Sequence, residues 1–318
     1  MKKTLIAISL VFISVIACKK DDPENPYDVN EEVVVVDNPD ANALPVGNFA
    51  WLHAKVFKPT CANSGCHDGT FEPNFTTISS SYNSLVNHPV ISNDEAFSFQ
   101  YRVVPGSVGA SLLNERMTVD IPNSSGVMPL EVDEDSDWET LGDSYIQQIA
   151  QWIAAGAPDM YGNMPGGAGA DFPPQVEGLA IFPAGNTTTP YERDEDGIGI
   201  TPILVEATNV DVWVYVTDDN TAPQDLGVSE LRIAEDTETI GAATPALFAT
   251  GESINALNFS ENPANFLHKA TIDLSGYASG TTLFLRTYFD DGVQSEVTEV
   301  PSDNSNEIIT SIFVMRIQ

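Results

Sequence analysis

The first half of the chain carries apolar residues at helical spacing. One stripe predicts a helix over residues 47–58 and consists of Phe49, Leu52, Val56 and Phe57. A second stripe predicts a helix over residues 143–155 and consists of Ile146, Ile149, Ala150 and Ile153. Shorter helices are expected at residues 79–86 and 110–117. We expect Pro59 to end the first helix, because the residue before a proline disfavours the helical conformation.

From about residue 176 the pattern changes to the alternation that is typical of strands. The clearest run is 210–216, Val-Asp-Val-Trp-Val-Tyr-Val. Further strands are expected at residues 179–182, 203–207, 231–234, 270–274, 282–289 and 308–317. Turn signals such as Asp290-Asp291-Gly292 separate them. This pattern predicts an antiparallel β-sandwich, immunoglobulin-like in style.

The N-terminus reads as an export signal. Lys2 and Lys3 precede an apolar run over residues 5–16, which is too short to span a membrane comfortably. Val15-Ile16-Ala17-Cys18 then resembles a bacterial lipobox, which implies cleavage after Ala17 and a lipid on Cys18. The next residues, Lys19-Lys20-Asp21-Asp22, resemble the signal that sends lipoproteins of Bacteroidota to the outer face of the outer membrane. We therefore expect a cell-envelope lipoprotein at the outer membrane, on its periplasmic or cell-surface side.

Composition divides the chain into five parts. Residues 1–17 are the predicted signal peptide, and residues 18–45, rich in Asp, Glu, Asn and Pro, form a lipidated flexible tether. Residues 46–160 form an all-α domain. Residues 161–175 are a Gly/Pro-rich linker, and residues 176–318 form the all-β domain.

The charge balance excludes one class of partner. The chain has 13 Lys and Arg against 46 Asp and Glu, a formal charge of −33. Binding nucleic acid needs a basic surface, so we expect no nucleic-acid role. An acidic surface suits partners with basic docking patches.

The candidate chemistry lies in the stretch Cys61-Ala62-Asn63-Ser64-Gly65-Cys66-His67. This Cys-x4-Cys-His pattern is a c-type haem attachment motif with a widened gap. Two thiols add to the haem vinyl groups, and the adjacent imidazole of His67 ligates the iron. With Cys18 assigned to the lipid, the three cysteines of the chain are accounted for. The alternative is a haem-free protein with a Cys61–Cys66 disulfide.

Four pieces in order resemble the cytochrome c domains of exported proteins of Bacteroidota and planctomycetes, and they cover roughly residues 47–160. They are Phe57 to His67, Val104-Pro105-Gly106 with Ser111-Leu112-Leu113, Met128-Pro129-Leu130, and Ile149 to Pro158. The resemblance implies a class I cytochrome c-like fold with Met128 as distal iron ligand. The Cys-x4-Cys gap departs from the usual pattern of the family.

The residues themselves also favour Met128. It lies in a loop between two predicted helices, and Pro129 stiffens that loop. A thioether paired with histidine raises the haem potential. The competing ligands are His88, which would give a bis-His haem, and the less favoured His53, Met117, Met160 and Met164. Arg102 and Arg116 are candidates to pair with haem propionates, with an ordinary surface role as the alternative.

We expect from this a monohaem cytochrome that carries single electrons with redox partner proteins and is not an enzyme. If Met128 does not ligate, the haem is five-coordinate and suits a sensor or enzyme. A second alternative is a surface-binding lipoprotein whose active part is the β-sandwich. The acidic loop Asp194-Glu195-Asp196-Gly197 is a weak Ca2+ candidate, because it lacks EF-hand spacing.

Overall fold

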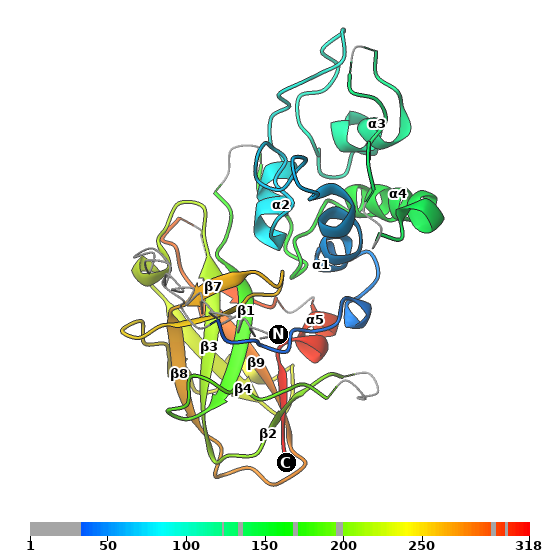
Figure 1. Cartoon of the computed structure of the whole chain (residues 1–318). Helices are drawn as coiled ribbons and strands as arrows, with labels where there is room; N and C mark the ends of the chain where they lie inside the picture. Colours follow the sequence, from blue (N-terminus) through cyan, green and yellow to red (C-terminus); the bar gives the residue numbers. More distant parts are fainter. Residues whose placement is uncertain are drawn as a thin grey trace, which may run out of the picture. The chain divides into compact units, whose positions relative to one another are not determined.

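The computed structural model describes residues 33–122, 124–132, 136–167, 171–194, 200–293, 297–302 and 305–318 (Figure 1). Residues 33–318 form one compact unit. The predicted signal peptide, Cys18 and residues 195–197 of the calcium candidate lie outside the described residues. Within the described ranges, no helix has both the length and the apolar character that a membrane crossing requires.

The helices before the strands are α1 (Phe49–Leu52), α2 (Ile78–Leu85), α3 (Leu112–Thr118) and α4 (Trp138–Ala154). Helix α1 continues as the wider π-helix His53–Cys61. The prediction that Pro59 ends the helix is wrong, because the chain changes to a wider turn, in which Ala62 N donates to Phe57 O over 3.1 Å. The helix therefore delivers Cys61 as its last residue.

The prediction of an all-α, class I cytochrome c-like domain is wrong. The described structure is 23% helical and 25% strand, with short helices. Between α2 and α3 the chain makes loops and isolated bridges, such as Val86 with Val103 and Pro89 with Tyr101. The reason lies in the sequence of residues 87–110, which is rich in Gly, Pro, Asn and Ser and has no apolar helical stripe.

The rest of the chain is rich in strands. They are β1 (Gln175–Pro183), β2 (Ile203–Val205), β3 (Asn209–Thr217), β4 (Ser229–Ala234), β5 (Ala246–Leu247), β6 (Ile254–Leu257), β7 (Pro263–Phe266), β8 (His268–Asp273), β9 (Thr282–Phe289), β10 (Thr298–Val300) and β11 (Val314–Ile317). One sheet has the order β1-β3-β8. Another has the order β2-β11-β9-β4-β5, with β10 beside β9, and β6 and β7 form a hairpin.

The prediction that this part is all-β and antiparallel is also wrong. Strands β2 and β11 pair in parallel, with Met315 opposite Ile203. The expected strand over residues 308–317 divides into helix α5 (Asn306–Ser311) and β11. Ile308, Ile309 and Ile312 are all buried, and their spacing matches one helix face.

Two hydrophobic clusters cover the two faces of the β1-β3-β8 sheet. Leu179 and Val212 belong to the larger cluster, which also includes residues of β9 and of α4. Phe182 and Trp213 face the smaller cluster, where Val34 and Val36 cover them. Val34 donates to Asn255 O over 2.8 Å and accepts from Leu257 N over 3.1 Å. Residues 33–45 of the expected tether therefore include positions that belong to the folded unit.

Candidate functional site

The Cys61–His67 stretch is a compact loop whose two ends lie next to each other. His67 N donates to Cys61 O over 3.1 Å, and Cys66 N donates to Asn63 O over 2.8 Å. Gly65 adopts a φ of 78°, in the left-handed region that favours glycine. Its N–H donates to Asp68 Oδ2 over 3.0 Å. The four-residue gap is therefore absorbed by one tight turn.

The two cysteines of this loop are free thiols, and each is half-buried. Burial, with a smaller contribution from nearby Cys66, raises the pKa of the Cys61 thiol to about 12. Cys61 therefore stays protonated at neutral pH. The structure does not place a disulfide between Cys61 and Cys66.

The His67 ring lies between two aromatic side chains. Its centroid is 5.4 Å from that of Phe75, which is buried, and 5.1 Å from that of Phe71, which is exposed. Burial lowers the pKa of His67, and the carbonyls of Pro73 and Phe71 oppose that effect. His67 Nδ1 is buried and makes no hydrogen bond of ordinary geometry. A neutral imidazole is the form that ligates a metal.

The loop that carries Met128 is attached to helix α3. Met128 N donates to Arg116 O over 2.8 Å, and the Met128 side chain is half-exposed. Arg116 Nη2 donates to Ser125 Oγ over 2.9 Å, whereas the buried Nη1 has no partner. The charges of Arg102 and, less strongly, Arg116 add to the lowering of the His67 pKa that burial causes. A guanidinium nitrogen without a hydrogen-bond partner fits an anionic group, such as a haem propionate.

Four of the five competing ligands are engaged elsewhere in the described structure. His88 Nε2 lies 3.2 Å from Glu72 Oε2, and the same carboxylate accepts from Arg102 Nη2 over 2.8 Å. His53 is 1% exposed and contacts two serine hydroxyls. Met117 is a core residue. Met160 is likewise a core residue. Met128 is half-exposed, and Met164, which follows the last helix of this part, is 65% exposed, so these two methionines are the candidates that are free of packing and pairing.

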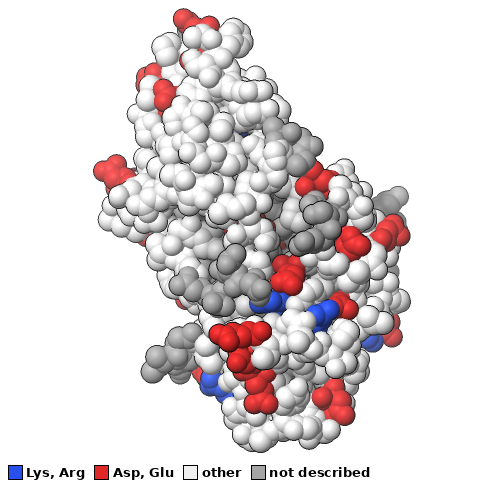
Figure 2. All heavy atoms as spheres, turned by 180° about the vertical axis from the view of Figure 1, so that it is seen from behind, with Lys and Arg blue, Asp and Glu red and all other residues white. Residues whose placement is uncertain are grey.

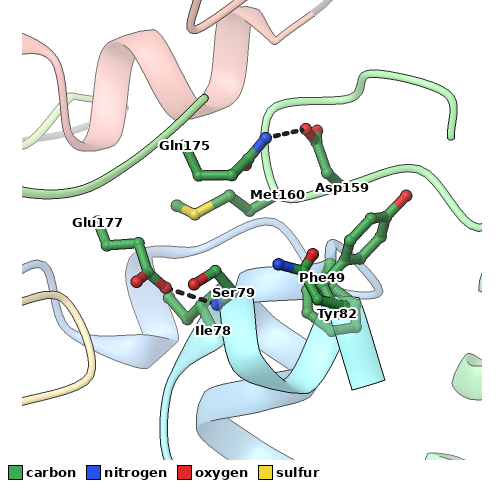
Figure 3. A pocket seen from close by; sticks show the side chains of 9 residues that line it. Phe49, Ile78, Ser79, Tyr82, Asp159, Met160, Gln175 and Glu177 are labelled. Atoms are coloured by element: carbon green, nitrogen blue, oxygen red, sulfur yellow. Dashed lines mark hydrogen bonds between the residues drawn. The ribbon is translucent and has the colours of Figure 1, made fainter. Parts of the chain in front are cut away.

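A small cavity lies away from this loop, where α2 meets β1 (Figure 3). Its volume is about 10 Å³, which is room for about one water molecule. The lining residues are Phe49, Ile78, Ser79, Tyr82, Asn83, Asp159, Met160, Gln175 and Glu177. Glu177 Oε1 accepts a 2.5 Å hydrogen bond from Ser79 N, and Gln175 Nε2 donates to Asp159 Oδ2 over 3.2 Å. Burial raises the pKa of both carboxyl groups, Glu177 and Asp159.

Sequence reasoning missed the contacts that join the loop region to the strands. The turn between β6 and β7, residues 258–262, lies against the chain on both sides of the Cys61–His67 loop. Its sequence, Asn-Phe-Ser-Glu-Asn, contains turn-forming residues, but it does not predict which distant residues the turn contacts. Only the assembled fold shows that contact.

No three His, Cys, Asp or Glu side chains converge to hold a metal ion in the parts of the chain that the structure describes. Comparison of the chain with protein-family models, with curated proteins and with solved structures found no match.

Proposed function

We propose that this chain binds one haem covalently through Cys61 and Cys66 and transfers single electrons. The observation that supports it most is the Cys61–His67 loop. Two free thiols lie on one tight turn, and the hydrogen bond from His67 N to Cys61 O holds the backbone of His67 next to that of Cys61. These are the groups that a c-type haem requires.

Each of the neighbouring residues has a role in this proposal. Phe71 and Phe75 contact the His67 ring, which would ligate the iron, and Met128, on the loop attached to α3, would supply the second protein ligand. Arg116 would pair with a propionate through its unpartnered Nη1. When bound, the haem supplies a one-electron iron couple whose potential is set by the axial ligands and by burial.

The acidic surface of the chain fits a basic redox partner. Figure 2 shows one face on which acidic side chains outnumber basic ones. The chain as a whole carries a formal charge of −33. Opposite charge raises association rates at low ionic strength. We further propose that a lipid on Cys18 holds the protein at the cell envelope, where such a partner docks.

The test is covalent haem staining after denaturation. The full chain is produced in a host with c-type cytochrome maturation machinery, beside Cys61→Ala, Cys66→Ala and the double variant. As a second route, the reduced apoprotein is incubated anaerobically with ferrous haem, which requires no machinery. We expect stain in the wild type, loss in the double variant, and a pyridine haemochrome spectrum of two saturated vinyl groups. Absence of bound haem by both routes would overturn the proposal.

A further inference from the structure

The turn between β6 and β7, residues 258–262, is braced by its own polar side chains. Asn258 Oδ1 accepts hydrogen bonds from Ser260 N and from Asn262 N, each over 3.0 Å. The turn is also anchored on β1, because Phe259 N donates to Glu177 O over 2.7 Å. Asn258 and Ser260 are both buried. The 258–262 turn is therefore a preorganised feature of the β-rich part.

This turn contacts the π-helix that delivers Cys61. Lys58 Nζ donates to Ser260 O and lies 3.6 Å from Glu261 Oε2. Lys58 precedes Cys61 by three positions, one turn or less of helix. The 258–262 turn thus holds the chain directly before the first thiol.

The same turn contacts the chain that follows His67. Asn262 Nδ2 donates to Thr76 O over 2.9 Å. Ile78 N, the first backbone donor of α2, donates to Ser260 Oγ over 3.1 Å. Ser79 N, the next donor, is bound by Glu177 of β1 (Figure 3). The first N–H groups of a helix lack internal partners, and here residues of the β-rich part satisfy two of them.

His53 connects these two contacts. Its Nε2 lies 3.4 Å from Ser260 Oγ, and its Nδ1 lies 2.9 Å from Ser81 Oγ. Ser81 Oγ donates to Thr77 O over 2.6 Å, so it accepts from His53 Nδ1–H. Ser260 Oγ then accepts from Ile78 N and donates to His53 Nε2. In this buried row of hydrogen bonds, each donor has one acceptor. The row therefore requires a neutral His53 that carries its proton on Nδ1.

From these contacts we infer that the 258–262 turn is a clamp that positions the Cys61–His67 loop, with Ser260 as its central positioning residue. The functional consequence of this inference rests on the proposed function. If the loop binds haem, a clamp on both flanks of the loop fixes the orientation of the His67 imidazole that ligates the iron. In this account the β-rich part supports the haem site and is not an independent binding module.

The test is hydrogen exchange of the Cys66 and His67 amides in the full chain without haem. Ser260→Ala leaves Ile78 N and His53 Nε2 without a partner, which we expect to raise both exchange rates about tenfold or more. Ser260→Thr keeps the hydroxyl and should restore slow exchange. Ser253→Ala, an exposed serine of the same region, should change nothing. Asn262→Ala is the milder second variant in case Ser260→Ala fails to fold.

Exchange at Cys66 and His67 that is unchanged in both Ser260→Ala and Asn262→Ala would overturn the clamp. In the haem-loaded protein, Ser260→Ala is expected to shift the reduction potential, and Ser260→Thr to return it towards the wild-type value. The exchange readout needs no haem. A chain that shows the exchange effect but never binds haem would refute the proposed function alone, and a haem-binding chain without the effect would refute the clamp alone.

Discussion

The peptide nitrogen of His67 donates a 3.1 Å hydrogen bond to the carbonyl oxygen of Cys61. This bond joins the candidate iron ligand to the first candidate thioether residue, although four residues separate the two cysteines. The widened gap therefore needs a tightly folded loop, and the stability of that loop becomes a property that can be measured.

Gly65 adopts the left-handed conformation at the tight turn of that loop. Its φ of 78° is unfavourable for residues with a Cβ, yet a Cβ added there would meet nothing within 4 Å. We expect Gly65→Ala to cost about 1 kcal/mol of unfolding free energy from backbone strain alone. Gly65→Asn should cost less, because Asn tolerates the left-handed region. Urea unfolding of the two variants measures this, and equal stability of Gly65→Ala and the wild type would contradict it.

A matched pair of variants, one at Met128 and one at His88, tests which of the two side chains ligates the iron. In the haem-loaded protein we expect Met128→Leu to abolish the thioether–iron charge-transfer band of the ferric form and to lower the reduction potential. His88→Gln should leave both unchanged, because His88 is paired with Glu72. Optical spectroscopy and potentiometry decide between them. A spectrum altered by His88→Gln and not by Met128→Leu would assign the ligand to His88.

His53 makes the stability of the fold depend on pH. Burial lowers the pKa of His53 from an ordinary value of 6.5 to about 3. Between these pH values His53 is protonated in the unfolded chain and neutral in the folded chain. The free energy of unfolding therefore falls as pH falls from about 6.5 towards 3. The slope from a fully buried histidine is about 1.4 kcal/mol per pH unit.

Urea unfolding of the wild type and His53→Gln between pH 7 and pH 4 isolates this slope. We expect a flatter profile for His53→Gln. Buried Glu177 acts in the opposite direction, because its pKa is raised and its stabilising protonated form is lost as pH rises. Glu177→Gln is therefore the matched variant, and it should steepen the loss of stability on acidification. Parallel profiles for His53→Gln and the wild type would show that His53 is not the cause.

Gly178 allows β1 to lie close to Phe266. A Cβ at position 178 would overlap Phe266 Cζ and would lie 3.1 Å from Tyr215 Cβ. We expect Gly178→Ala to destabilise the fold by about 1–3 kcal/mol through overpacking. Phe266→Leu, in combination, should recover part of that loss, which a double-mutant cycle in urea detects. Purely additive effects would contradict the proposed clash.

The positions of the strands were predicted better than their pairing into sheets. The run over residues 210–216 became β3, and residues 282–289 became β9 with the same bounds. Alternation identifies such strands because both faces of the sheet impose a period of two. It does not identify their partners, so the parallel pairing of β2 with β11 was missed. The hairpin β6–β7 was also missed, since its strands are only four residues each.

The helical part was predicted less well. Helix α4 was expected from residue 143, but it begins at Trp138. The expectation of an all-α domain relied on motifs that specify chemistry more than fold. In the candidate site, the residue types of Cys61, Cys66 and His67 were readable because their spacing is local. The clamp by Ser260 was not readable, since its partner Ile78 is 182 positions away.

The intact mass of the denatured full chain tests the central claim most directly. The wild type, produced with maturation machinery or loaded anaerobically with ferrous haem, is predicted to gain the mass of one haem and to retain it under denaturing conditions. Peptide mapping is predicted to place that mass on the peptide that contains Cys61 and Cys66. A denatured chain that has only its polypeptide mass, or a Cys61–Cys66 disulfide in place of the added group, would contradict the account.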